Sequence, residues 1–189
     1  DTSQLLSETG TTPWVNNDLF NSEFNYKRQI HGVYSTYSSN LASIEYMLGL
    51  RLEYTNRTFD FSGKKDPYLY EKIKYYPSLH ASYNISEPHQ LFVSYSKRVN
   101  RPRGWYLEPF PSFRGQKNIR LGNPNLVPED IHSMELGYQY RFGKSFVTVE
   151  GFYKQVQNGI SRLYRPVDSV NLELTEEQLA FIDRDAFVM

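Results

Sequence analysis

Apolar and polar side chains alternate with a period of two residues along several parts of the chain. In residues 43–54, Leu48, Leu50 and Leu52 share one face, whereas Arg51 and Glu53 lie on the other. A two-residue period places successive side chains on opposite faces of a β-strand. The pattern predicts strands at about residues 26–38, 43–54, 75–83, 90–98, 131–141 and 145–157. We therefore expect an all-β fold in which each strand has one apolar and one polar face.

The connections between these strands alternate between short and long. Residues 39–42, 84–89 and 142–145 form short turns, whereas residues 55–74 and 99–129 form long connections. Pro77 has no N–H to donate to a neighbouring strand, so we expect it at the start of the third strand. Outer-membrane barrels have tight turns at one rim and long loops at the other. The alternation therefore favours an antiparallel up-and-down transmembrane β-barrel segment, with about six strands of a larger barrel and the apolar face toward lipid.

The composition narrows the classes of protein to consider. The formal net charge is zero, so the chain has no general attraction for nucleic acid. The absence of cysteine excludes disulfides and thiolate metal sites. No basic and apolar leader opens the chain, so we expect a mature or excised segment. The 16 Tyr, 12 Phe and 2 Trp residues suit surfaces that are apolar along the ring and wet at one edge, such as bilayer interfaces.

Several motifs resemble one family of membrane proteins. Residues 122–129 read GNPNLVPE and residues 135–138 read ELGY, which is similar to the late barrel strands of TonB-dependent outer-membrane receptors. Residues 94–102 (SYSKRVNRP), 49–54 (GLRLEY) and 151–154 (GFYK) resemble further strands of the SusC-like Bacteroidetes members, in the expected order. The likeness covers about residues 25–160. It identifies the chain as a C-terminal barrel fragment of such a receptor.

The resemblance implies a location and a set of partners. Family members take up a scarce nutrient (a glycan, a peptide or an iron chelate) across the Gram-negative outer membrane, through a barrel of about 22 strands that holds a plug. The implied partners are outer-membrane lipid, the plug and remaining barrel strands, the TonB complex and a surface lipoprotein. The sequence contains no plug and no TonB-binding segment, so we expect residues 1–189 to be part of one barrel domain. The family assigns no catalytic or ligand-binding role to the matching residues.

The GNPNLVPE segment also has a physical interpretation of its own. Asn123 is expected to form an Asx turn, and Pro124 fixes its own φ, so the loop reverses sharply there. Pro128 and Glu129 then begin a strand at a position where no ladder hydrogen bond is needed. The segment is thus predicted to be a corner between a loop and a strand.

The titratable residues predict no reaction centre. The four histidines, His31, His80, His89 and His132, lie on separate strands or turns without metal-ligand spacing, so we expect no metal and no cofactor. Charged residues on the polar faces are expected to line a wet barrel lumen rather than to form an acid–base pair. These lumen-facing candidates are Glu45, Arg51, Glu53, Glu135 and Glu150. We therefore expect a protein that is not an enzyme.

One connection combines cations with aromatic rings. Within residues 99–129, we select Arg101, Arg103, Trp105 and Tyr106 as candidate contacts to a ligand or a partner. Such side chains stack on sugars and grip anions, but the same composition is typical of loops that pack on one another at a barrel rim. A soluble β-sandwich that binds carbohydrate is the alternative function. It would require a second sheet packed on the leucine face of residues 48–52.

Overall fold

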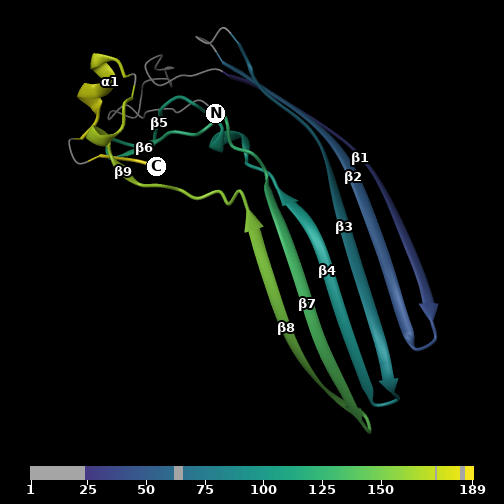
Figure 1. Ribbon diagram of the computed structural model, residues 1–189. Helices are drawn as coiled ribbons and strands as arrows, with labels where there is room; N and C mark the ends of the chain where they lie inside the picture. The colour runs from purple at the N-terminus through teal and green to yellow at the C-terminus, as the bar shows by residue number, and fades with distance from the viewer. Residues whose placement is uncertain (1–23, 62–65, 173, 184–185) are drawn as a thin grey trace, which may run out of the picture.

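The fold is dominated by one antiparallel sheet. The computed structural model describes residues 24–61, 66–172, 174–183 and 186–189. Six strands pair in sequence order and form a single curved layer, and no described helix covers either face (Figure 1). They are β1 (Phe24–Leu41), β2 (Ile44–Phe61), β3 (Tyr68–Ser86), β4 (His89–Asn100), β7 (Glu129–Phe142) and β8 (Ser145–Gln157). The sheet is not closed, because β1 and β8 are its two edges.

Tight turns lie at one end of this sheet. Each of three hairpins closes through two residues, between the pairs Leu41↔Ile44, Ser86↔His89 and Phe142↔Ser145. Gly143 takes a φ of 60°, which favours glycine because it has no Cβ. At the opposite end β2 ends, β3 begins and the connection after β4 lies (Figure 1), so we call the two ends the turn end and the loop end. The predicted antiparallel order of these strands is confirmed. The predicted alternation of short and long connections is reproduced only in part, because β2 and β3 are separated by residues 62–67 alone.

The strand register separates the side chains into two faces. The apolar face carries cross-strand rows such as Leu48, Leu79, Tyr95, Met134 and Tyr153. The polar face carries rows such as Glu45, Ser82, Phe92, Gly137 and Glu150. On the apolar face Leu136 is 61% and Val149 is 66% exposed, so no described layer packs there. The soluble sandwich, which needs such a layer, therefore receives no support from the described residues.

Several strands are longer than predicted. Residues 55–74 were expected to be a connection, but β2 continues to Phe61 and β3 begins at Tyr68. The extension of β2 alternates buried and more exposed positions, and its buried set is Thr55, Arg57 and Phe59. The sequence did not reveal this two-residue period. Beyond the apolar band of the strands, side chains on both faces can be polar, as Asn and Asp are here. Pro77 does not begin its strand; it stands next to Ser78, where the ladder between β3 and β4 ends.

A second, smaller assembly lies at the loop end. Four short strands form a sheet in the order β5 (Ser112–Phe113), β6 (Asn118–Arg120), β10 (Phe187–Val188) and β9 (Arg165–Pro166). Three short helices accompany it, η1 (Gly104–Tyr106), η2 (Val167–Ser169) and α1 (Glu176–Phe181). Thr175 caps the N-terminus of α1 and forms a reciprocal capping box with Gln178.

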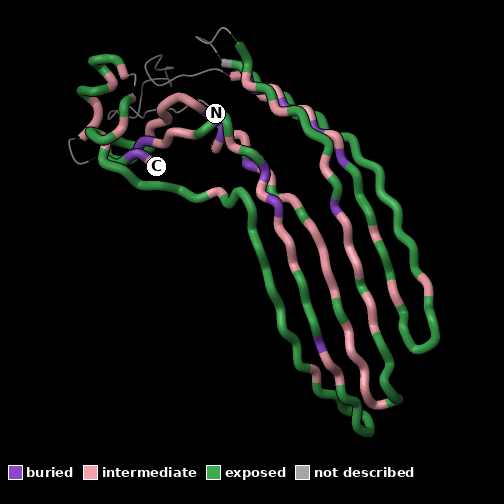
Figure 2. The backbone as a smooth tube through the Cα atoms, in the orientation of Figure 1, coloured by how far each residue is buried: buried purple, intermediate pink, exposed green. Residues whose placement is uncertain are grey.

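The buried residues gather mainly at the loop end. Figure 2 shows buried segments there, whereas most of the large sheet is exposed or half-buried. The buried apolar side chains include Leu107, Ile119 and Val188, which come from the β4–β7 connection and from the end of the described chain. Residues 99–129 were expected to be a connection without strands. That prediction is wrong, because the connection contains η1, β5 and β6, and both of its predicted ends belong to long strands.

Candidate functional site

The large sheet divides at the loop end. The pairing of β3 with β4 stops at Ser78↔Ser96, although β3 extends to Tyr68. Beyond this point β4 pairs only with β7, up to Asn100↔Glu129. The parts of β3 and β4 nearest the loop end therefore have no ladder between them. Side chains and the connection of residues 101–128 join the two halves instead.

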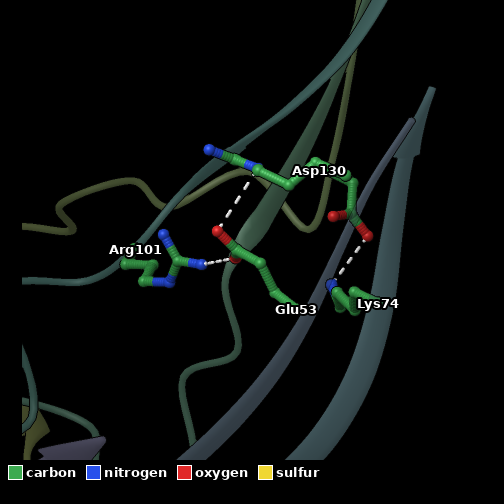
Figure 3. Close-up of polar contacts among 5 residues, drawn as sticks. Glu53, Lys74, Arg101 and Asp130 are labelled. Carbon is green, nitrogen blue, oxygen red and sulfur yellow. Dashed lines mark hydrogen bonds and ion pairs between the residues drawn. The ribbon is translucent and has the colours of Figure 1, made fainter. Parts of the chain in front are cut away.

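Two ion pairs bridge the divided sheet (Figure 3). Arg101, just after β4, donates through Nη2 to Oε2 of Glu53 on β2. Lys74 of β3 donates to Asp130 of β7, with 2.8 Å between Nζ and Oδ2. Both carboxylates are buried, and Glu53 also forms an ion pair with Arg51, with 3.3 Å between Nε and Oε1. Buried charges require partners of this kind, so these pairs tie the two halves together.

A buried arginine fixes the GNPNLVPE segment to the sheet. Arg57 of β2 donates through Nη2 to the carbonyl oxygens of Pro124, at 3.3 Å, and Leu126, at 3.0 Å. Its guanidinium carbon also lies 5.1 Å from the centroid of the Tyr70 ring. One side chain thus satisfies two carbonyl groups of the loop and gains a cation–π contact. The segment is therefore anchored on the polar-face side of β2.

The same segment makes a close backbone contact with η1. The Gly122 N–H donates to the Glu108 carbonyl oxygen at 2.7 Å, and the Asn123 N–H donates to the Tyr106 carbonyl oxygen at 2.7 Å. A Cβ at Gly122 would lie 2.6 Å from the Tyr106 carbonyl oxygen, so only glycine fits there. The predicted Asx turn is confirmed, because Asn123 Oδ1 accepts from the Asn125 N–H at 3.0 Å.

A pocket of about 290 Å³ lies against this contact, and we call it the rim pocket. Its wall combines η1, the residues after β6, the residues after β8 and the described end of the chain. The lining residues are Trp105, Tyr106, Arg120, Leu121, Gly122, Asn123, Leu126, Ile160, Ser161, Arg162, Leu163, Arg165, Val170, Val188 and Met189. Four segments distant in sequence therefore build one cavity.

Stacked rings and guanidinium groups form one side of the rim pocket. The Trp105 and Tyr106 rings stack with their centroids 3.7 Å apart. The guanidinium carbons of Arg120 and Arg162 each lie 5.1 Å from the Trp105 centroid. The Tyr106 hydroxyl accepts from Arg162 Nη2 at 3.4 Å, and this contact raises the pKa of the Arg162 guanidinium above its ordinary value. The group therefore stays charged at every physiological pH.

A larger hollow of about 600 Å³ lies on the polar face of the large sheet. Glu45, His80, Ser94 and Glu135 are among its lining residues, and Ser94 Oγ donates to Glu135 Oε2 at 3.0 Å. Over the described residues, no group of three or more acidic, histidine or cysteine side chains is placed to hold a metal ion. Within the same residues, no helix is long and apolar enough to cross a membrane.

Comparison with known families decides what kind of chain this is. The model of a family described as outer membrane protein beta-barrel matches residues 1–178. The chain belongs to this family. A search of curated proteins finds no match. Membership places the protein in the outer membrane, and the strand pattern and the exposed apolar face have the form that such a location requires.

In this outer membrane β-barrel protein, only part of the predicted contact set comes together; the set is Arg101, Arg103, Trp105 and Tyr106. Trp105 and Tyr106 line the rim pocket. Arg101 does not; it is committed to Glu53 in the divided sheet. Arg103 is exposed and is not among the pocket residues. The polar charged set (Glu45, Arg51, Glu53, Glu135 and Glu150) does share one face of the sheet, as the register shows.

The contact set predicted from the sequence did not include three arginines of the rim pocket of this outer membrane β-barrel protein. Arg120 lies in β6, Arg162 lies between β8 and β9, and Arg165 lies in β9. The residues after β8 show no two-residue period, so their return to the loop end was not predictable. The position of these arginines beside Trp105 and Tyr106 depends on the sheet of β5, β6, β10 and β9, which the sequence did not predict.

Proposed function

We propose that this chain forms part of the barrel wall and outer loops of a TonB-dependent receptor for a scarce nutrient. The nutrient classes are a glycan, a peptide or an iron chelate. The anchored GNPNLVPE segment is the observation that carries the proposal, because it is also the strongest motif shared with that family. In this proposal the loop end faces the exterior, and the remaining strands of a larger barrel cover the edges β1 and β8.

The two faces of the sheet support a role in a barrel wall. An open sheet edge is not tolerated in lipid, so β1 and β8 require further strands on both sides. The apolar face would contact lipid, and the charged polar face would line the lumen. Phe152 stands on that polar face with 84% of its surface exposed, which fits contact with a domain inside the barrel. We propose transport rather than an enzymatic reaction as the activity.

The proposal is tested with the full-length gene product in its own outer membrane. Uptake of labelled ferric chelates, oligosaccharides and oligopeptides is measured in the intact strain, in a strain without this gene and in a strain without TonB. We expect uptake of one class to fall in both deletion strains and to return with the intact gene. Uptake that persists without TonB, or that never depends on this gene, would refute the proposal.

A second experiment tests the loop end. In the full receptor, Trp105→Ala together with Arg103→Ala should weaken uptake while heat-modifiable gel mobility, which reports barrel assembly, stays unchanged. Phe146→Ala, an exposed aromatic at the turn end, is the matched control and should leave uptake unchanged. If the rim variant transports at the wild-type rate, or fails to assemble, these residues serve only to pack the loops.

A further inference from the structure

We propose that the rim pocket binds an oxyanion, either a carboxylate or a phosphate, carried on a small apolar body, with Arg162 and Arg165 as the anion-binding groups. The proposal deepens the proposed function by naming a ligand chemistry for the loop end. It rests on the proposed function only in taking the ligand to arrive from the exterior. The chemistry follows from the charge, hydrogen bonding and shape of the pocket.

The rim pocket has a one-sided charge. Its described lining includes Arg120, Arg162 and Arg165 but no acidic residue. Arg120 is already neutralised, because its Nη2 lies 2.7 Å from Glu108 Oε2 and both side chains are largely buried. Within the described part of the chain, neither of the other two arginines forms an ion pair. The pocket therefore holds two positive charges without a carboxylate partner.

The contacts of the Arg162 guanidinium are with neutral groups, the hydroxyls of Tyr106 and Tyr164 and the sulfur of Met189. Its Nη2 reaches the Tyr106 hydroxyl at 3.4 Å, and its Nη1 reaches Met189 Sδ at 3.9 Å. Both distances are long for hydrogen bonds to strong acceptors, and a thioether sulfur accepts only weakly. A guanidinium group presents five donors in a planar fork that matches the two oxygens of a carboxylate or phosphate. Arg162 thus has the geometry to take an oxyanion at little loss of existing contacts.

The rest of the wall favours a small apolar body. Leu121, Leu126, Ile160 and Val188 line the cavity beside the arginines. The volume of about 290 Å³ is at the lower end of the range of small-molecule sites. Stacking of a neutral sugar on Trp105 is less favoured, because that ring already contacts Tyr106 and two guanidinium groups. An amphipathic anion uses both the cations and the apolar wall.

The test measures binding to the purified full-length protein in detergent micelles by titration calorimetry. Two matched probe pairs differ mainly in charge: phenylacetate against phenylacetamide, and phenyl phosphate against phenyl carbamate. We expect at least one anion to bind about tenfold more tightly than its neutral analogue, as for a hydrogen bond to a charged group. Preference in the first pair identifies a carboxylate ligand, and preference in the second identifies a phosphate ligand.

Substitutions connect this preference to the pocket. Arg162→Gln with Arg165→Gln should make each anion bind no more tightly than its neutral analogue, because glutamine keeps polarity and removes charge. Arg141→Gln, at the turn end, is the control and should retain the preference. Equal binding of both members of each pair, no binding at all, or a preference that survives the double substitution would overturn the proposal.

The experiment also separates this inference from the proposed function. Binding in micelles needs neither TonB nor an energised membrane. Anion selectivity without TonB-dependent uptake would refute the receptor role and leave the pocket standing. TonB-dependent uptake without anion selectivity would refute the pocket alone.

Discussion

The buried pair between Glu53 and Arg101 allows a quantitative prediction about the loop end. Glu53→Gln removes the carboxylate that two arginines share, because both Arg51 and Arg101 contact it. Arg101→Gln leaves Glu53 with Arg51 as a remaining partner at 3.3 Å. The two substitutions should therefore have unequal effects, although they break the same ion pair.

The magnitudes follow from the burial of the groups. Removal of one partner from a buried ion pair costs about 3–5 kcal/mol, because the other charge stays buried and unpaired. We expect Glu53→Gln to lower the free energy of loop opening by about 3 kcal/mol, and Arg101→Gln by about 2 kcal/mol. The interaction between the two side chains is lost in each single variant and cannot be lost twice, so the double variant should cost about 3 kcal/mol rather than about 5 kcal/mol.

Native-state proteolysis with chymotrypsin measures this opening. When cleavage is slower than reclosing, the rate is proportional to the open population. Cleavage after Tyr106 should then rise about 100-fold in Glu53→Gln, since each 1.36 kcal/mol changes the population about tenfold. Glu150→Gln, on the same face but exposed, is the control and should change the rate less than about threefold. Additive effects of the two substitutions in the double variant would refute a direct interaction between the side chains.

Two further predictions concern the large sheet in the full-length protein. Leu50→Arg on the apolar face should destabilise folding into lipid vesicles by about 2–4 kcal/mol if that face contacts the bilayer core. Met47→Arg, on the polar face, is its control, and equal effects in urea titrations would argue against the assignment of faces. A Cβ at Gly137 would overlap the Phe92 ring, so Gly137→Ala should cost about 1–3 kcal/mol. Phe92→Ala in the same chain should remove that cost, and an unchanged cost would place the strain elsewhere.

The fold of the large sheet was predictable where burial follows the two-residue period. Leu48, Leu50 and Leu52 lie on one face because an apolar band must avoid water, and this constraint is visible in the sequence. The strand extensions were not predictable, because beyond the band both polar and apolar residues satisfy the same backbone ladder. Hydrogen bonding along that ladder does not depend on side-chain type. Polar residues such as Asn56 and Asp60 therefore do not distinguish a strand from a loop in the sequence.

The candidate site was predictable only in part. The aromatic pair Trp105 and Tyr106 attracted attention because cations and rings alternate nearby, and both do line the rim pocket. The role of Arg101 was not apparent, because its partner Glu53 lies on β2 and only the two ladders β2–β3 and β3–β4 bring them together. Arg162 comes to the pocket because β9, which follows it closely, pairs with β10, and β10 pairs with β6. These long-range contacts have no local pattern in the sequence.

The two-residue turns have a consequence for the order of folding. Each of the hairpins β1–β2, β3–β4 and β7–β8 pairs strands that adjoin in sequence, and isolated hairpins form within about 1–10 μs. The ladder between β4 and β7 instead closes a loop of about 28 residues, which costs about 2 kcal/mol more in chain entropy than closing a two-residue turn. We therefore expect the three hairpins to form before the β4–β7 seam. Arg57, Lys74 and Arg101 join β2 and β3 to β7 and to the connection after β4, so their contacts form only after that seam closes. Their loss should therefore speed opening more than it slows folding.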